Sequence, residues 1–196
     1  MADAHEFLED DPYIGPLIER HGRLELDPAE STFERLVVSV LRQQVSTASA
    51  EATRKRLYDA VEITPTGILA ADTETLKDCG LSRQKASYVA NIAEAFDSTY
   101  EEGYFESLDD QSVVDELTTI TGVGEWTAHM QLLFALGRPD VFPVGDLAIR
   151  KGMQTVFGEE MSRTEMVERA ERWKPYRSYA SLYLWRADED AAPGGE

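Results

Sequence analysis

Hydrophobic side chains recur with the spacing of amphipathic helices along most of this chain, and this pattern constrains the fold more than any other feature. One apolar stripe has residues at i, i+3, i+4, i+7 and i+8: Phe33, Leu36, Val37, Val40 and Leu41. Similar patterns predict helices over residues 47–60, 74–78, 82–96, 111–119, 125–136, 146–157, 162–173 and 175–188. Only Val61–Thr64 alternates with period two, and it is too short to build a sheet. The sequence therefore predicts an all-α protein.

Helix start signals accompany these patterns. Ser31 with Glu34, and Ser162 with Glu165, have the spacing of a capping box, in which two side chains satisfy backbone N–H groups reciprocally. The final residues, 191–196, are small, polar or glycine, and we expect them to be disordered. No low-complexity linker divides the remainder, so residues 1–190 are expected to form a single domain.

The charge balance is strongly acidic, with 37 Asp and Glu against 19 Lys and Arg and a formal net charge of −18. Proteins that bind nucleic acid normally carry basic patches, so this balance alone argues against such a partner. The acidic residues are spread along the whole chain, a pattern that also suits a protein from a halophile, working in a salty cytoplasm. An ordinary acidic enzyme is the alternative.

Other features of the composition limit the class of protein. No apolar run approaches the roughly 20 residues that a membrane span needs, and the acidic start MADAHEFLEDD is not typical of a targeting peptide. A single cysteine, Cys79, can form no internal disulfide and hold no iron–sulfur cluster. The three histidines lack the spacing of metal ligands. We expect a cytoplasmic protein without a membrane partner.

The most informative segment lies between two predicted helices and reads LTTITGVGEWTA, from Leu117 to Ala128. Gly122 and Gly124 allow a sharp turn at positive φ and let another molecule approach the backbone closely. The N–H groups at the start of the next helix add an anion site that needs no basic side chain and suits a phosphodiester. A plain corner between two helices, with glycines for steric reasons, is the alternative.

This segment resembles the helix-hairpin-helix of base-excision DNA glycosylases. Three further motifs occur in the order that the superfamily shows: LRQQVS at 41–46, DVFPVGD ending at Asp146, and ERWKPYRSYA at 171–180, with Trp185 beyond. The chain is therefore identified as a member of the HhH-GPD superfamily, similar to its 3-methyladenine glycosylase II branch, over roughly residues 28–187. The resemblance implies a compact form without an additional N-terminal β-domain. It implies two lobes with the hairpin at a central cleft. One lobe comprises roughly residues 1–30 and 125–190, and the other comprises roughly residues 31–124.

An aspartate that opens a helix is usually only a cap. By resemblance, Asp146 is also the catalytic carboxylate. Cleavage of an N-glycosidic bond gives the sugar oxocarbenium character, which a carboxylate can stabilise directly or by activating water. Both roles stay open.

Trp126 stands where bifunctional relatives carry a lysine that forms a Schiff base, so no lyase activity is expected. By resemblance, Trp126, Trp185 and Met130 line a pocket for the target base, although both tryptophans could instead be core residues. Electron-rich rings suit purines that carry positive charge after alkylation. The branch often has aromatic residues near 130 and 147, where this chain has Met130 and Leu147.

The resemblance also assigns residues that contact DNA. Gln44, or Gln43 beside it, would fill the gap left by a flipped base, although glutamines at a helix end are commonly just exposed. The DNA backbone would be bound by the hairpin: Gly122, Val123, Gly124 and Thr127. A monovalent cation would bind backbone carbonyls there: Thr118, Ile120 and Val123. Arg150, Lys151 and Arg177 could reach phosphates or be solvated charges.

The sequence thus predicts a monofunctional glycosylase that removes alkylated purines of the 3-methyladenine and 7-methylguanine type. Its partner would be double-stranded DNA with alkylated bases, and we expect a nucleoid-associated monomer with no required cofactor. A mismatch or oxidised-base glycosylase on the same scaffold, and a non-catalytic hairpin module that only binds DNA, are the alternatives.

Overall fold

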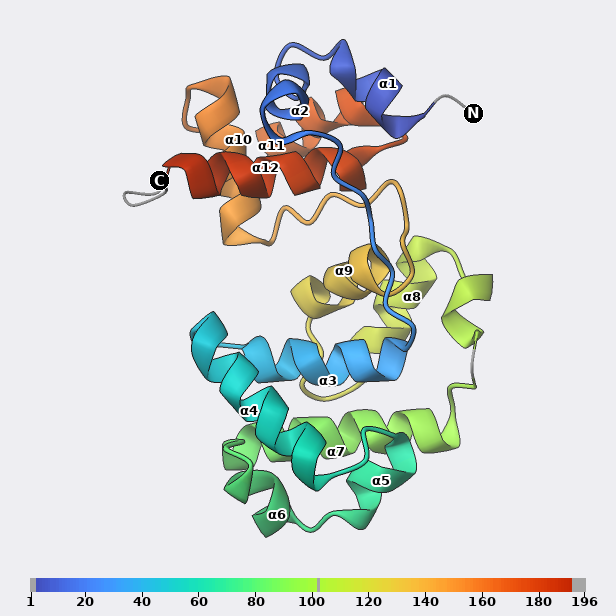
Figure 1. Ribbon diagram of the computed structural model, residues 1–196. Helices are drawn as coiled ribbons and strands as arrows, with labels where there is room; N and C mark the ends of the chain where they lie inside the picture. The colour runs from blue at the N-terminus through green and yellow to red at the C-terminus, as the bar shows by residue number, and fades with distance from the viewer. Residues whose placement is uncertain (1–2, 102, 192–196) are drawn as a thin grey trace. The chain divides into compact units, whose positions relative to one another are not determined.

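The computed structural model describes residues 3–101 and 103–191, and the described residues form helices, turns and loops without a strand. The predicted all-α class is confirmed. The helices are α1 (Ala4–Glu9), α2 (Gly15–His21), α3 (Thr32–Arg42), α4 (Thr47–Ala60), α5 (Pro65–Ala70), α6 (Thr73–Asp78), α7 (Arg83–Ser98), α8 (Asp110–Thr118), α9 (Glu125–Phe134), α10 (Leu147–Phe157), α11 (Arg163–Ala170) and α12 (Arg177–Ala191). Two short 3₁₀ helices, η1 (Tyr104–Ser107) and η2 (Glu171–Trp173), complete the set (Figure 1).

Contacts divide the chain into two compact units. Unit 1 comprises Met1–Pro28 and Gly137–Glu196, and unit 2 comprises Ala29–Leu136. The helix after the hairpin is expected to group with the terminal segments, whereas the contacts place α9 in unit 2, because α9 packs against α3 and α8. The boundary therefore falls at Gly137 rather than near residue 125.

Unit 1 is built around the pair α10 and α12, with α2 and α1 on α12 and α11 on α10 (Figure 1). Its core is apolar and almost fully buried: Leu8, Ile14, Ile18, Ile149, Met153, Met166, Ala170, Trp173, Ala180, Tyr183 and Leu184. Gly152 lets the two central helices approach closely, because a Cβ there would lie 2.1 Å from the carbonyl oxygen of Leu184. This packing holds the start of α10 against α12.

Unit 2 is built around α3 and α7, with α4, α5, α6, α8 and α9 around them. The stripe predicted on α3 forms its centre, since Leu36, Val37 and Val40 have no exposed surface. Two short-helix–turn–helix units occur in sequence, α6–α7 and α8–α9. Each turn contains a glycine at positive φ, Gly80 at 101° and Gly122 at 107°.

The observed helix starts agree in part with the predicted caps. The capping box of Ser162 and Glu165 forms in both directions. The box predicted for Ser31 forms in one direction only: Ser31 accepts from the Glu34 amide, but the Glu34 carboxylate accepts a 2.6 Å bond from the Tyr58 hydroxyl instead.

The last helix runs through Ala191, and residues 192–196 of the predicted disordered tail lie outside the described residues. Among the described residues, no helix is both long enough and apolar enough to cross a membrane.

Candidate functional site

Asp146 caps the N-terminus of α10, as the sequence predicts. Its Oδ1 accepts from the backbone N–H of Ile149 at 3.0 Å, and also from the indole Nε1–H of Trp185 at 3.2 Å. Asp146 is half-buried, so the carboxylate is neither sealed in the core nor extended into solvent. The two donors fix the carboxylate, and the positive end of the α10 dipole favours its negative charge.

The loop before Asp146 is held by its own chain. The Arg150 guanidinium donates to the carbonyls of Val144, Gly145 and Asp146 at 2.7–3.2 Å, and the Asp146 amide donates to the Pro143 carbonyl at 2.8 Å. Arg150 therefore braces the loop that positions the carboxylate.

Trp185 lies on α12 and is half-buried against the core of unit 1. It also lines a hollow of about 320 Å³ together with Leu24, Glu25, Leu182, Arg186 and Glu189. From the sequence, Trp185 could be a pocket aromatic or a core aromatic, and its hydrogen bond to Asp146 is not predicted. No signal in one sequence connects two residues on different helices in this way.

The hairpin joins α8 to α9 within unit 2, and Gly122 fixes its shape. Gly122 has φ +107°, and a Cβ there would lie 2.3 Å from the ring of Tyr88, so both backbone conformation and packing require glycine. Two side chains from other helices brace the turn. Gln43 donates to the Gly122 carbonyl at 3.2 Å, and Asn91 donates to the Thr121 carbonyl at 3.1 Å.

The other hairpin residues predicted to contact DNA differ in how exposed they are. Gly124 is the N-cap of α9, and the space where its Cβ would stand is open. The side chains of Val123 and Thr127 are buried, so any contact that they make with a partner would come from their backbone. Of the carbonyls predicted to bind a cation, those of Thr118, Ile120 and Val123, the one of Ile120 accepts a bond from the Val123 amide at 3.0 Å.

The two glutamines at the end of α3 have different surroundings. Gln43 is half-buried and engaged with the hairpin, whereas Gln44 is exposed. Gln44 has φ +57°, a left-handed conformation that is uncommon for a residue other than glycine. Both glutamines line a hollow of about 360 Å³ with Lys85 and Tyr88. Of the two predicted wedges, Gln44 is the one whose side chain is accessible.

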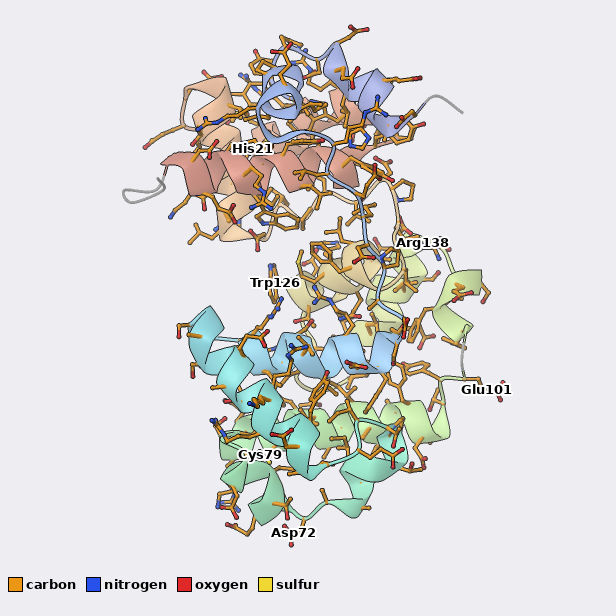
Figure 2. All side chains as sticks on the ribbon, in the orientation of Figure 1. His21, Asp72, Cys79, Glu101, Trp126 and Arg138 are labelled. Atoms are coloured by element: carbon orange, nitrogen blue, oxygen red, sulfur yellow. The ribbon has the colours of Figure 1, made fainter. Side chains whose placement is uncertain are left out.

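Trp126 and Met130 lie one turn apart on α9. Trp126 is 37% exposed and projects outward from the first turn of the helix (Figure 2), whereas Met130 is 5% exposed. Trp126 thus presents an aromatic surface next to the glycine corner.

The cations that could reach phosphates are mostly engaged elsewhere. Arg177 forms a two-point ion pair with Asp140, at 2.7 and 3.0 Å, and a further bond to Glu171. Arg150 braces the loop described above, and Lys151 is exposed. The described surface of unit 1 therefore holds these two arginines in internal contacts.

Comparison with protein families identifies the scaffold. The family model described as "HhH-GPD superfamily base excision DNA repair protein" matches residues 37–178. This range includes the LRQQVS segment, the hairpin, Asp146 and most of the ERWKPYRSYA motif.

Individual relatives agree with this match. The chain is 34% identical to DNA-3-methyladenine glycosylase 1 of Schizosaccharomyces pombe, over 80% of this chain and 72% of that protein. It is 27% identical to the YfjP protein of Bacillus subtilis, over 90% of this chain and 66% of the relative, slightly under two thirds of its length. The solved structure of the S. pombe 3-methyladenine DNA glycosylase Mag1 in complex with abasic DNA superposes with a TM-score of 0.85 at 29% identity, covering 94% of this chain and 96% of that one. The chain belongs to the HhH-GPD superfamily of base excision DNA repair proteins.

Proposed function

We propose that this protein is a monofunctional DNA glycosylase that hydrolyses the N-glycosidic bond of alkylated purines, with Asp146 as its essential carboxylate. The observation that carries the proposal is the fixed Asp146 side chain, held by the Ile149 amide and the Trp185 indole in the motif that its superfamily shares. Several relatives carry the name DNA-3-methyladenine glycosylase, which supports the substrate class.

The reaction breaks the bond between the sugar C1′ and the base nitrogen. The bonding electron pair leaves with the base, and an alkylated purine departs readily because it gives up its positive charge as it leaves. The negative charge of Asp146 stabilises the oxocarbenium character that develops on the sugar. The oxygen of a water molecule then bonds to C1′, and its proton passes to Asp146 or to solvent.

The absence of lyase chemistry follows from the side chain at the hairpin. A lysine at the position of Trp126 would supply the amine that attacks the sugar, and tryptophan has no such group. Trp126 would instead stack on the purine, whose positive charge strengthens contact with an aromatic face.

DNA binding would depend on the backbone of the hairpin, since the chain has a net charge of −18. The amides around Gly122 and Gly124 would hold a phosphodiester, and the exposed Gln44 would enter the gap left by the flipped nucleotide. The complex of Mag1 with abasic DNA supports DNA as the partner.

The proposal is tested by measuring which bases are released from duplexes that each contain one lesion. We expect release of 3-methyladenine and 7-methylguanine, and no covalent complex on reduction with borohydride. Release of thymine from mismatches or of 8-oxoguanine, without any methylated purine, would establish a mismatch or oxidised-base glycosylase instead. Tight binding with no release of any base would establish a non-catalytic module.

Two glycine variants separate the folding of the hairpin from its contact with DNA. Gly122→Ala should destabilise unit 2 by about 2–4 kcal/mol, because it combines strained backbone with overpacking against Tyr88. Gly124→Ala should fold normally, because φ is −96° and the surrounding space is open, yet bind DNA at least tenfold more weakly, on the order of one lost phosphate contact. Thermal unfolding and duplex affinity of both variants check this. Unchanged affinity in Gly124→Ala would remove the hairpin from the binding surface.

A further inference from the structure

The turn between α3 and α4 carries Gln44 in a conformation that the rest of unit 2 has to maintain. Gln44 has φ +57°, and its side chain is exposed. A residue other than glycine stays in the left-handed region only where its surroundings fix the backbone, and such residues cluster at functional sites. The contacts that fix this turn therefore bear on the proposed entry of Gln44 into DNA.

Lys85, on α7, fixes the turn at the end of α3. Its ammonium donates to the Leu41 carbonyl at 2.7 Å, and Leu41 belongs to the last turn of α3, where carbonyls lack a partner within the helix. In residues 3–101 and 103–191 this is the only hydrogen bond of the ammonium, which forms no ion pair although the chain has 37 acidic residues. Burial lowers the pKa of Lys85, so the charge is held there at a cost in hydration.

One side of α7 supports both this turn and the hairpin. Lys85, Tyr88 and Asn91 follow one another at intervals of three residues, so each is next to the following one on the helix surface. Tyr88 packs against Gly122, and Asn91 donates to the hairpin at 3.1 Å. Gln43 joins the two parts directly through its 3.2 Å bond to the Gly122 carbonyl. The turn before α4 and the glycine corner are therefore held on a common support.

We infer that Lys85 is a positioning residue, which holds Gln44 in the conformation from which its side chain enters the duplex. The inference rests on the proposed function and deepens it. Lys85 acts through the backbone of α3 and takes no part in breaking the N-glycosidic bond. The Leu41 carbonyl lies three residues before Gln44, so its release lets the turn relax to conformations that glutamine adopts more readily. Fewer molecules then present Gln44 to DNA, and the apparent affinity for a duplex with an everted base falls.

The test compares single-turnover base release from two duplexes that differ only opposite the lesion. In one, 7-methylguanine is paired with cytosine; in the other, it faces an abasic site, so that no base pair has to be broken. Lys85→Met keeps most of the apolar stem and removes the donor. We expect it to lower release from the paired duplex about tenfold, as for one lost hydrogen bond from a charged donor, and release from the unpaired duplex much less. Lys77→Met is the matched control: it removes the same charge from α6, where Lys77 is paired with Glu74 at 2.8 Å, and should change neither rate.

A double variant shows whether Lys85 acts through Gln44. Gln44→Ala should show the same selective loss on the paired duplex, and adding Lys85→Met to it should cost little more, because both changes remove one interaction. A merely structural role for Lys85 would add its own loss to that of Gln44→Ala and would lower release from both duplexes.

Thermal unfolding establishes that each variant is folded before the rates are compared. An equal loss on both duplexes in Lys85→Met, as expected of a phosphate contact, would overturn the inference alone, and so would full additivity with Gln44→Ala. If Lys85→Met does not fold, an unchanged ratio of the two rates in Lys85→Gln, whose side chain is shorter and uncharged, decides in the same way. Unaltered release by Gln44→Ala on both duplexes would overturn the inference together with the insertion of Gln44. Release of no base from either duplex by the wild type would overturn the proposed function itself.

Discussion

Replacing Asp146 with asparagine is expected to lower the rate of base release about 10³-fold, while fold and DNA affinity stay near those of the wild type. Asparagine keeps an oxygen that can accept from both the Ile149 amide and the Trp185 indole, and it caps helices about as well as aspartate. The substitution therefore removes the charge and little else. Single-turnover release of 3-methyladenine from a methylated duplex measures the effect.

A matched control is available in the same chain. Asp72 caps α6 through a 2.7 Å bond from the Thr75 amide, in a part of unit 2 that has no proposed role in catalysis. Asp72→Asn makes the same chemical change at a helix start and should leave turnover unaltered. Unchanged turnover in Asp146→Asn, with the protein folded and DNA bound, would show that the carboxylate is only a cap.

Local sequence signals predict helices well where the stripe is long and the cap is a side chain. The stripe on α3 and the caps at Asp146 and Ser162 are found where expected. Three helices of six or seven residues, α1, α2 and α5, are not predicted, because so few residues show little of a periodic stripe. The helix α6 is equally short, but the glycine that follows it, Gly80, marks its end. At α5, Thr64 caps the helix and Pro65 occupies its first turn, where proline is favourable.

From the sequence, individual candidate residues of the site could be predicted, but the contacts between them could not. The sequence offers Asp146, Trp185 and the glycine corner as candidates, yet it shows neither the bond between Trp185 and Asp146 nor the bond between Gln43 and Gly122. Both are contacts between elements that are distant along the chain, which a pattern of local spacing does not contain. The same reason explains why Glu34 leaves the predicted capping box for Tyr58.

Base release by this protein is expected to persist, and to increase from low salt, at KCl concentrations of about 1–2 M. A protein that neutralises 6–10 phosphates with lysine and arginine loses roughly 10³–10⁵ in affinity between 50 and 200 mM salt, because binding releases counterions. Here Arg150 and Arg177 are engaged with their own chain, and the proposed contacts are amides, a glutamine and an aromatic ring. Such contacts release few counterions, so we expect no comparable loss of affinity over that range.

The direction at low salt follows from the net charge of −18, which repels a polyanion until ions screen the interaction. Duplex affinity and single-turnover release, measured from 0.05 to 3 M KCl, show how binding and turnover change with salt concentration. Circular dichroism at each concentration separates loss of binding from loss of fold, since self-repulsion also destabilises an acidic chain at low salt. A steep fall in affinity between 50 and 200 mM, with the protein folded throughout, would mean that cationic side chains hold the DNA after all. The acidic composition would then have no connection with how the hairpin binds.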